Sequence, residues 1–201
     1  VSGWLVASSA LKRPYWTFVR GKMRTVLAPM LIWNILSVVL VCGAVPHMPL
    51  AEARKQIADG IAQVLPYAAS NKVKLAIEPL HPMYAADRSA INRMAEAREV
   101  CEKLQSPWLG IAADVYHIWW DPELKPQIAR AGKDRLLAFH VCDWLVPTKD
   151  ILNDRGMMGD GVIDITSVRS TVEAQGFAGY SEIEIFSNDW WSKPMDEVLQ
   201  T

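Results

Sequence analysis

Short apolar runs recur along the chain from residue 38 onward, separated by segments with helical spacing of apolar and polar residues. Apolar runs of this length are typical of strands buried on both faces of a parallel sheet. The five predicted strands are Val38–Cys42, Val73–Glu78, Leu109–Asp114, Leu136–Val141 and Tyr180–Phe186. Most intervening segments place apolar residues along one face of a helix. The predicted helices cover residues 49–70, 89–105, 122–132, 164–176 and 192–200.

Capping residues mark several of the predicted helix ends. Asp87 or Ser89 is predicted to cap the start of the second helix, and Asp164 the start of the fourth. Short oxygen-bearing side chains suit these positions because they accept hydrogen bonds from the first free N–H groups of a helix. Gly132 and Gly176 are predicted to end helices, because glycine readily adopts the left-handed conformation found after helix C-termini.

The predicted strands and helices alternate, which implies a parallel sheet with right-handed crossover connections. Two architectures remain open at this point, an open doubly wound sheet and a (β/α)₈ barrel. A nucleotide-binding doubly wound fold would need a glycine-rich phosphate turn, and the sequence contains neither a GxGxxG nor a GxxxxGK motif. A barrel needs eight strand–helix units in about 250 residues, whereas five units are recognisable here.

The first fifty residues differ from the rest, since they contain five basic residues and no acidic one. Residues 25–45 are almost wholly apolar. One interpretation is a membrane anchor, because about 20 apolar residues span a bilayer. The basic flank would then stay on the cytoplasmic side of the membrane. The alternative is a buried strand at 37–43. We predict that residues 1–36 form an atypical segment and that residues 37–201 form the folded domain.

Composition indicates a folded protein without a nucleic-acid partner. Hydrophobic residues make up 51% of the 201 residues, and the net charge is -1. Residues 1–50 hold five basic residues, so the rest of the chain holds 16 basic and 22 acidic ones. An acidic body disfavours nucleic-acid binding. The widely spaced Cys42, Cys101 and Cys142 form no disulfide framework or CxxC metal motif and indicate a reducing, cytoplasmic setting.

Four of the five predicted strands end in a potential metal ligand: Glu78, Asp114, His140 and Glu184. In a parallel barrel all four would lie at the C-terminal mouth, where barrel enzymes place their active sites. Three carboxylates and one imidazole suit Mn²⁺, Mg²⁺ or Co²⁺, with Zn²⁺ as an alternative. Each residue alone also has a structural interpretation. Asp114 could cap a helix, His140 could be a core residue, and Glu184 could share an ordinary half-exposed strand face with Glu182.

Several short motifs resemble, in their order and spacing, the sugar phosphate isomerase/epimerase family of xylose isomerase-like TIM barrels. They are IEPLHP with Glu78, DVYH with Asp114 and His117, HVCD with His140, MGDGVID at 158–164, and GFAGYSEIEIF with Glu184. The similarity covers residues 38–201 and implies a (β/α)₈ TIM barrel that lacks its N-terminal strands. It also implies that Glu78, Asp114, His140 and Glu184 bind the metal ion, and that His117 contacts the substrate.

The resemblance further implies a mechanism and a substrate class. In this family two metal-bound glutamates flank the substrate, here Glu78 and Glu184. One removes the proton next to a carbonyl, an enediolate forms, and the other returns the proton. Arg155, in the loop after His140, is a candidate for stabilising the enediolate, with a solvated loop charge as its alternative. The expected substrate is a sugar or a cyclitol, phosphorylated or not.

Aromatic and imidazole side chains follow the ligand-bearing strands. His81 and Tyr84 would line the pocket or belong to a structured loop after Pro79. Five tryptophans would stack on the apolar face of a sugar, or form a lid or a subunit contact in a homo-oligomer. These tryptophans are Trp119, Trp120, Trp144, Trp190 and Trp191.

Two other classes of protein remain open. An AP-endonuclease-type nuclease on the same barrel would need more histidine ligands and a basic groove, and the sequence has only His47, His81, His117 and His140. The other is a non-catalytic remnant, either an inactive truncated barrel or a membrane-anchored relative. If N-terminal strands are missing, we expect an open sheet of about five strands with helices mainly on one face. Its unpaired edges should favour aggregation.

Overall fold

The computed structural model describes residues 48–85 and 88–200. Residues Leu50–Thr201 form one compact unit. The predicted strand Val38–Cys42, the apolar segment 25–45 and the predicted boundary at residue 36 lie outside the described residues and stay predictions. Within the described ranges, no helix is both long enough and apolar enough to span a membrane.

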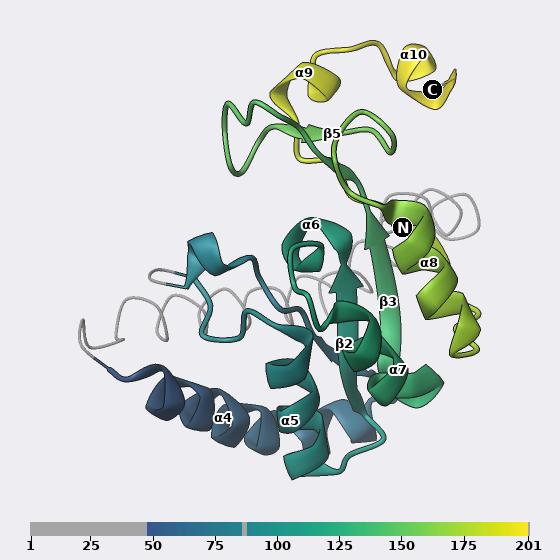
Figure 1. The fold of residues 1–201 in the computed structure, drawn as a ribbon. Coiled ribbons are helices and arrows are strands. Elements are labelled where there is room, and N and C mark those ends of the chain that lie inside the picture. The colour runs from purple at the N-terminus through teal and green to yellow at the C-terminus, as the bar shows by residue number, and fades with distance from the viewer. Residues whose placement is uncertain (1–47, 86–87, 201) are drawn as a thin grey trace, which may run out of the picture. The chain divides into compact units, whose positions relative to one another are not determined.

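Four parallel strands form the main sheet of the described residues, in the order β1-β2-β3-β6 (Figure 1). They are β1 (Leu75–Ile77), β2 (Leu109–Asp114), β3 (Leu136–Val141) and β6 (Ser181–Ile183). The predicted bounds of β2 and β3 are confirmed to the residue. The outer strands β1 and β6 are shorter than predicted, because each pairs with a neighbour over only three residues. The predicted open parallel sheet is thus confirmed for this part of the chain.

Helices connect the strands, and the four long ones correspond to predicted helices. These are α4 (Leu50–Ser70), α5 (Met94–Leu104), α7 (Leu124–Arg135) and α8 (Ile165–Ala174). The shorter helices are η2 (Pro82–Tyr84), α6 (Val115–Ile118), α9 (Asn188–Trp191) and α10 (Met195–Gln200). An antiparallel pair, β4 (Asp143–Trp144) with β5 (Arg155–Gly156), has no counterpart in the sequence-based prediction. Strands of two residues are too short to show a periodic pattern.

Helix α5 begins five residues later than predicted, at Met94. The carboxylate of Glu96 reaches back and accepts hydrogen bonds from the backbone N–H groups of Asn92 (2.7 Å) and Arg93 (3.3 Å). The predicted cap Ser89 instead accepts a hydrogen bond from the N–H of Ile91 (3.1 Å) within a local turn. The prediction of a Ser89 cap was therefore wrong, while Asp87 lies outside the described residues.

The other predicted helix ends agree better with the structure. Asp164 caps α8, since its carboxylate accepts a hydrogen bond from the N–H of Ser167 at 3.0 Å. Gly176 follows α8 with a positive φ of 83°. Gly132 also has a positive φ, 61°, and breaks the helical geometry of α7, but helical hydrogen bonding resumes and ends at Arg135. The predicted end of that helix is thus three residues early.

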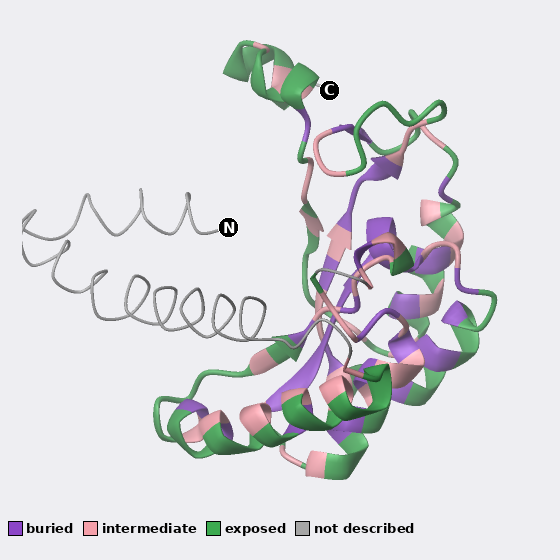
Figure 2. Cartoon of the chain, turned by 90° about the vertical axis from the view of Figure 1, so that its left-hand side faces the viewer, coloured by how far each residue is buried: buried purple, intermediate pink, exposed green. Residues whose placement is uncertain are grey.

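The apolar core lies between one face of the sheet and the helices that pack on it, α5 and α7 among them. Ile111 and Ala113 of β2 belong to this core. Because side chains of a strand alternate between its two faces, Ala112 and Asp114 lie on the opposite face. Figure 2 shows the buried positions concentrated along the strands and on the helix sides turned toward them. The four ligand residues described below lie on the second face, away from this core.

Gly110, on the second face of β2, permits a close approach between β2 and β3. A Cβ atom at this position would lie 2.5 Å from the carbonyl oxygen of Arg135 and nearer still to the Leu137 side chain. Real Cβ atoms do not approach backbone atoms so closely, so any side chain here would force the two central strands to shift.

We predict that Gly110→Ala lowers the free energy of unfolding by about 1–3 kcal/mol, the usual cost of overpacking. Gly60→Ala is the matched control, because a Cβ at Gly60, inside α4, meets nothing within 4 Å. That control should stabilise the protein by up to about 1 kcal/mol through helix propensity. Urea denaturation measures the change in the free energy of unfolding for each variant. Equal changes in the two variants would contradict the close packing of β2 against β3 at Gly110.

Candidate metal centre

Four side chains converge at the C-terminal ends of the four parallel strands. Glu78 directly follows β1, Asp114 ends β2, His140 lies near the end of β3, and Glu184 directly follows β6. One ligand atom from each residue lies within 4.8 Å of those of the other three. The chain therefore brings together all four residues that the sequence predicts as metal ligands.

Strand register explains this convergence. Asp114 pairs with His140, and His140 pairs with Glu182, so the three residues share one face of the sheet. Glu184 lies two residues beyond Glu182, and the period of two returns its side chain to that same face. Of the two glutamates at this end of the chain, Glu184 is the one that belongs to the four-residue group.

Three carboxylates in one partly buried place repel one another unless positive charge is near. Burial raises the pKa of Glu78, and the nearby Glu184 carboxylate raises it further. Burial also raises the pKa of Asp114, whose side chain is fully enclosed, while the neighbouring Arg155 opposes that rise. His140 holds the pKa of Glu184 low, at about 2, and Glu184 raises the pKa of His140 to about 9.

A divalent ion fits this donor set. The Nδ1 atom of His140 is buried and makes no hydrogen bond, and its contact with Glu184 Oε2 is a long ion pair at 3.6 Å. A divalent ion that takes the place of the Nδ1 proton would bond this nitrogen directly, because a metal ligand must be deprotonated. Carboxylate oxygens combined with one imidazole suit Mn²⁺, Mg²⁺ or Co²⁺, and Zn²⁺ is compatible as well.

Arg155 reaches the same group of residues from β5. Its Nη1 atom donates to Asp114 Oδ2 (3.0 Å), to Glu184 Oε2 (3.0 Å) and to the carbonyl oxygen of Glu184 (3.2 Å). The residue is 3% exposed. Its guanidinium also lies over the ring of Tyr116, 4.3 Å from the ring centre. Arg155 is therefore a buried cation at the site, and the alternative of a solvated loop charge was wrong.

His117 is held in one tautomer at the edge of the site. Its Nδ1 atom accepts a hydrogen bond from the backbone N–H of His81 at 3.1 Å. Burial, and next the charge of Arg155, lower the pKa of His117 to about 3, so the ring is neutral at pH 7. A neutral ring with an accepting Nδ1 carries its proton on Nε2. That atom lies 3.7 Å from Glu78 Oε1 and 3.7 Å from Asp114 Oδ2.

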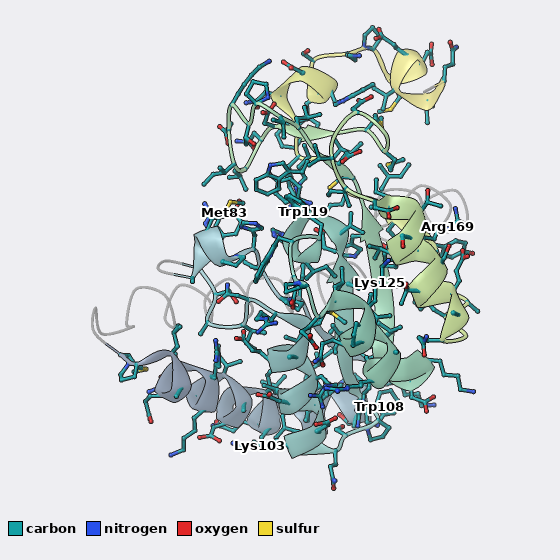
Figure 3. All side chains as sticks on the ribbon, viewed as in Figure 1. Met83, Lys103, Trp108, Trp119, Lys125 and Arg169 are labelled. Carbon is teal, nitrogen blue, oxygen red and sulfur yellow. The ribbon has the colours of Figure 1, made fainter. Side chains whose placement is uncertain are left out.

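Aromatic rings gather beside His117, after β2 and β3. Trp144 lies with its ring centre 4.6 Å from that of Tyr116 and 4.9 Å from that of His81. Trp119, labelled in Figure 3, lies 5.8 Å from Trp144, near the C-terminal ends of the strands. Trp120 lies 5.9 Å from His81. These three tryptophans therefore belong to one cluster near the four ligand residues.

The remaining candidates have other contacts. The hydroxyl of Tyr84 donates to the carbonyl oxygen of Ile151 at 2.9 Å, so Tyr84 holds the loop between β4 and β5. Trp190 lies under the ammonium group of Lys193, and the ring of Trp191 contacts Phe186. The described contacts do not join these two tryptophans to the cluster around Trp144.

Asp143 is a supporting residue that the sequence reasoning missed, although it lies in the quoted HVCD motif. Its buried carboxylate accepts hydrogen bonds from the N–H groups of Trp144 (2.9 Å), Gly159 (2.9 Å) and Ile163 (3.0 Å). Asp143 therefore fixes the loop that contains the MGDGVID motif against the end of β3. The sequence signal was an acid just after the apolar strand Leu136–Val141, but no spacing rule links it to the residues whose N–H groups it accepts from.

The chain belongs to the xylose isomerase-like TIM barrel family, since the family's sequence profile matches residues 33–200. The resemblance predicted from the motifs is thereby confirmed. With four parallel strands in the described residues, this part of the chain forms an incomplete barrel, as predicted.

Curated relatives include sugar-phosphate epimerases. L-ribulose-5-phosphate 3-epimerase UlaE from Escherichia coli O157:H7 is 26% identical over 137 residues, covering 68% of this chain and 44% of its own length. The enzyme of the same name from Shigella flexneri is 26% identical over 150 residues, covering 74% of this chain and 49% of its own length. The chain thus spans about half the length of the curated relatives it matches.

Solved structures agree on the fold. Protein SMc04130 from Sinorhizobium meliloti 1021 is 58% identical, with a TM-score of 0.73, and the match covers 77% of this chain and 56% of that one. The IolI protein, solved with a bound zinc atom, is 21% identical, with a TM-score of 0.66 and coverage of 77% and 55%. At that identity the likeness to IolI shows the fold alone.

The lowered pKa of His117 predicts a pH dependence of stability. A folded-state pKa of about 3, below the unfolded value of 6.5, means that stability is complete above pH 6.5 and is lost as pH falls toward 3. Within that window the loss approaches about 1.4 kcal/mol per pH unit. Metal-free wild type should therefore lose more stability between pH 7 and pH 4.5 than His117→Asn, which cannot gain a proton.

Urea denaturation in EDTA at both pH values checks this prediction. The carboxylates and His140 are present in both proteins, so the difference between the two pH profiles isolates His117. Parallel profiles would show that burial does not keep this ring neutral.

Proposed function

We propose that this chain carries the active site of a divalent-metal-dependent sugar epimerase or isomerase. The observation that carries the proposal is the convergence of Glu78, Asp114, His140 and Glu184 on one place at the C-terminal ends of parallel strands. The buried Nδ1 of His140, which makes no hydrogen bond, adds support for a metal ion. The family relationship, with relatives named L-ribulose-5-phosphate 3-epimerase, favours a sugar as the substrate.

In this proposal the four residues hold the ion. When bound, a divalent ion supplies polarisation of the sugar's carbonyl and the neighbouring hydroxyl. The chain's own residues then move the proton. Either Glu78 or Glu184 removes the proton from the carbon next to the carbonyl, and the electron pair of the broken C–H bond moves into the carbonyl to form an enediolate. The other glutamate, which is protonated at the start of the turnover, gives its proton to the opposite face of that carbon, so the two glutamates exchange protonation states.

The sheet order supports the use of two glutamates. β1 and β6 are the outer strands of the described sheet, so Glu78 and Glu184 approach from opposite sides of Asp114 and His140. A substrate between them would present its two faces to two different carboxylates. Removal of a proton from one face and its return to the other inverts a carbon centre, which is the change that an epimerase makes.

His117 and Arg155 bind and orient the substrate in this proposal. The Nε2–H of His117 faces Glu78 and Asp114 and has the geometry of a donor to a sugar oxygen. Arg155 places a buried positive charge beside Glu184, where it would offset the negative charge of the enediolate. His81 fixes the His117 ring through its backbone N–H, and Tyr84 fixes the neighbouring loop.

The aromatic cluster suits a sugar or cyclitol, because aromatic rings stack on the apolar faces of such molecules. We propose that the substrate is a sugar or a cyclitol, and both phosphorylated and unphosphorylated forms are candidates. We expect no nucleic-acid partner, because the chain beyond residue 50 is acidic. A cytoplasmic location and a homo-oligomer stay predictions.

A metal-dependent activity screen tests the proposed function. Purified protein is treated with EDTA and assayed on ketohexoses, ketopentoses, their phosphates and inososes, with and without added Mn²⁺, Mg²⁺, Co²⁺ or Zn²⁺. We expect epimerised or isomerised product only after an ion is restored. Product formation that is equal in EDTA would contradict the metal-dependent mechanism, and absence of product in every arm would favour a non-catalytic protein.

A pair of glutamate variants tests the proton transfer. Glu184→Gln keeps the size of the side chain but removes the base, and turnover should fall about 10²-fold or more. Glu182→Gln makes the same change of charge two residues earlier on the same strand, outside the ligand group, and should keep near-normal turnover. If the two variants behave alike, Glu184 has no part in the reaction.

A further inference from the structure

We propose that Arg155 is a built-in counter-cation of the metal centre, which holds Asp114 and Glu184 together while no divalent ion is bound and competes with that ion once it arrives. The inference rests on the proposed metal site. It concerns the occupancy of that site rather than the reaction, so it can be tested without a substrate.

The contacts of Arg155 carry the proposal. A single nitrogen, Nη1, lies 3.0 Å from Asp114 Oδ2 and 3.0 Å from Glu184 Oε2, and thus joins two of the four ligand residues. The same nitrogen donates to the Glu184 carbonyl oxygen at 3.2 Å. Both carboxylates therefore have one cation in common within hydrogen-bonding distance.

Arg155 is fixed in this position by its surroundings. Its backbone N–H donates to the carbonyl oxygen of Phe186 at 3.0 Å. Its guanidinium lies 4.3 Å from the ring centre of Tyr116 and 4.8 Å from that of Phe186. The residue is only 3% exposed, and its Nε atom has no hydrogen-bond partner. A buried guanidinium with so little access to water depends on nearby carboxylates to offset its charge.

The guanidinium satisfies only part of the site. No hydrogen bond joins it to His140, whose buried Nδ1 makes no hydrogen bond and has only a long ion pair with Glu184, at 3.6 Å. The second guanidinium nitrogen, Nη2, lies 3.3 Å from His117 Nε2. Since that imidazole nitrogen carries a proton, two donors face each other there, which is an unfavourable contact. Arg155 therefore resembles a partial substitute for a metal ion: it contacts two of the four ligand residues, Asp114 and Glu184, and leaves the His140 nitrogen without a hydrogen bond.

Competition follows from charge and shared oxygen atoms. A divalent ion among the four ligands would place a second cation next to Arg155, and the two would repel each other and share the oxygens of Asp114 and Glu184. Arg155 should then stabilise the ion-free protein more than the ion-bound protein. Because linkage is reciprocal, removal of the Arg155 charge should tighten ion binding.

The test compares wild type with Arg155→Met, which retains an unbranched apolar chain for packing against Tyr116 and Phe186 but has no charge. Mn²⁺ binding to EDTA-treated, dialysed protein is measured by calorimetry, and thermal melting is measured with EDTA and with saturating Mn²⁺. We expect the Kd of the variant for Mn²⁺ to fall about fivefold or more, the lower end of typical coupling between two sites. The melting temperature should fall more in EDTA than in Mn²⁺.

A second variant guards against misfolding. Arg155→Lys keeps a positive charge but not the planar fork of the guanidinium, and its Mn²⁺ affinity should lie between those of wild type and Arg155→Met. If Arg155→Met is unfolded in EDTA yet folds in Mn²⁺, the counter-cation role is supported. If it stays unfolded in both conditions, the protein needs Arg155 whether or not an ion is present, and the proposal is wrong.

The remaining outcomes separate this inference from the proposed function. If the wild-type protein binds none of Mn²⁺, Mg²⁺, Co²⁺ and Zn²⁺, the metal centre does not exist and both proposals fail together. A wild type that binds Mn²⁺, with an Arg155→Met variant that binds it equally or more weakly, overturns only the inference. Arg155 would then position the carboxylates for the ion instead of competing with it.

Discussion

Repulsion among three carboxylates at one edge of a parallel sheet is the constraint on which the rest of the site depends. Parallel strands end at the same edge, so Glu78, Asp114 and Glu184 are brought together by the direction of the chain. Asp114 cannot reach water, since its side chain is fully buried. Positive charge must offset these acids, and the chain supplies it from His140 and Arg155.

The surrounding residues serve to hold those cations and acids in place. Arg155 comes from a two-stranded antiparallel pair that lies beyond the main sheet, and this pair is tied to the loop after β6 through Phe186. The hydroxyl groups of Tyr84 and Tyr116 both donate to the carbonyl oxygen of Ile151, which fixes the loop between β4 and β5. Asp143 fixes the segment that follows β5. These hydrogen bonds thus anchor several loops around the site.

Much of the sheet could be predicted from the sequence because β2 is buried along its whole length and β3 is buried or half-buried at every position. The bounds of β2 and β3 follow from uninterrupted apolar runs, and the period of two places Glu182 and Glu184 on one face. The outer strands end earlier than their apolar runs, since pairing on one side limits them. The start of α5 was mispredicted because a glutamate inside the helix caps it, rather than a residue before it.

Sequence pattern could not place the residues that come from loops. Arg155 lies in a strand of two residues, which has no periodicity, and only the folded chain brings it to carboxylates 41 and 29 positions away. The tautomer of His117 depends on a backbone N–H from another loop, and no spacing rule encodes that contact. The four ligand residues were predictable because each lies at the end of an apolar strand, and Arg155 was a candidate, but its contacts with Asp114 and Glu184 were not predictable.

The central claim is that Glu78, Asp114, His140 and Glu184 form a single site for one divalent ion. Anomalous diffraction from crystals grown with Mn²⁺ tests it most directly. The account predicts one strong anomalous peak about 2.0–2.6 Å from ligand atoms of these four residues. If crystals grown with Mn²⁺ show the ion only at another place, or show no ion, the result contradicts this claim.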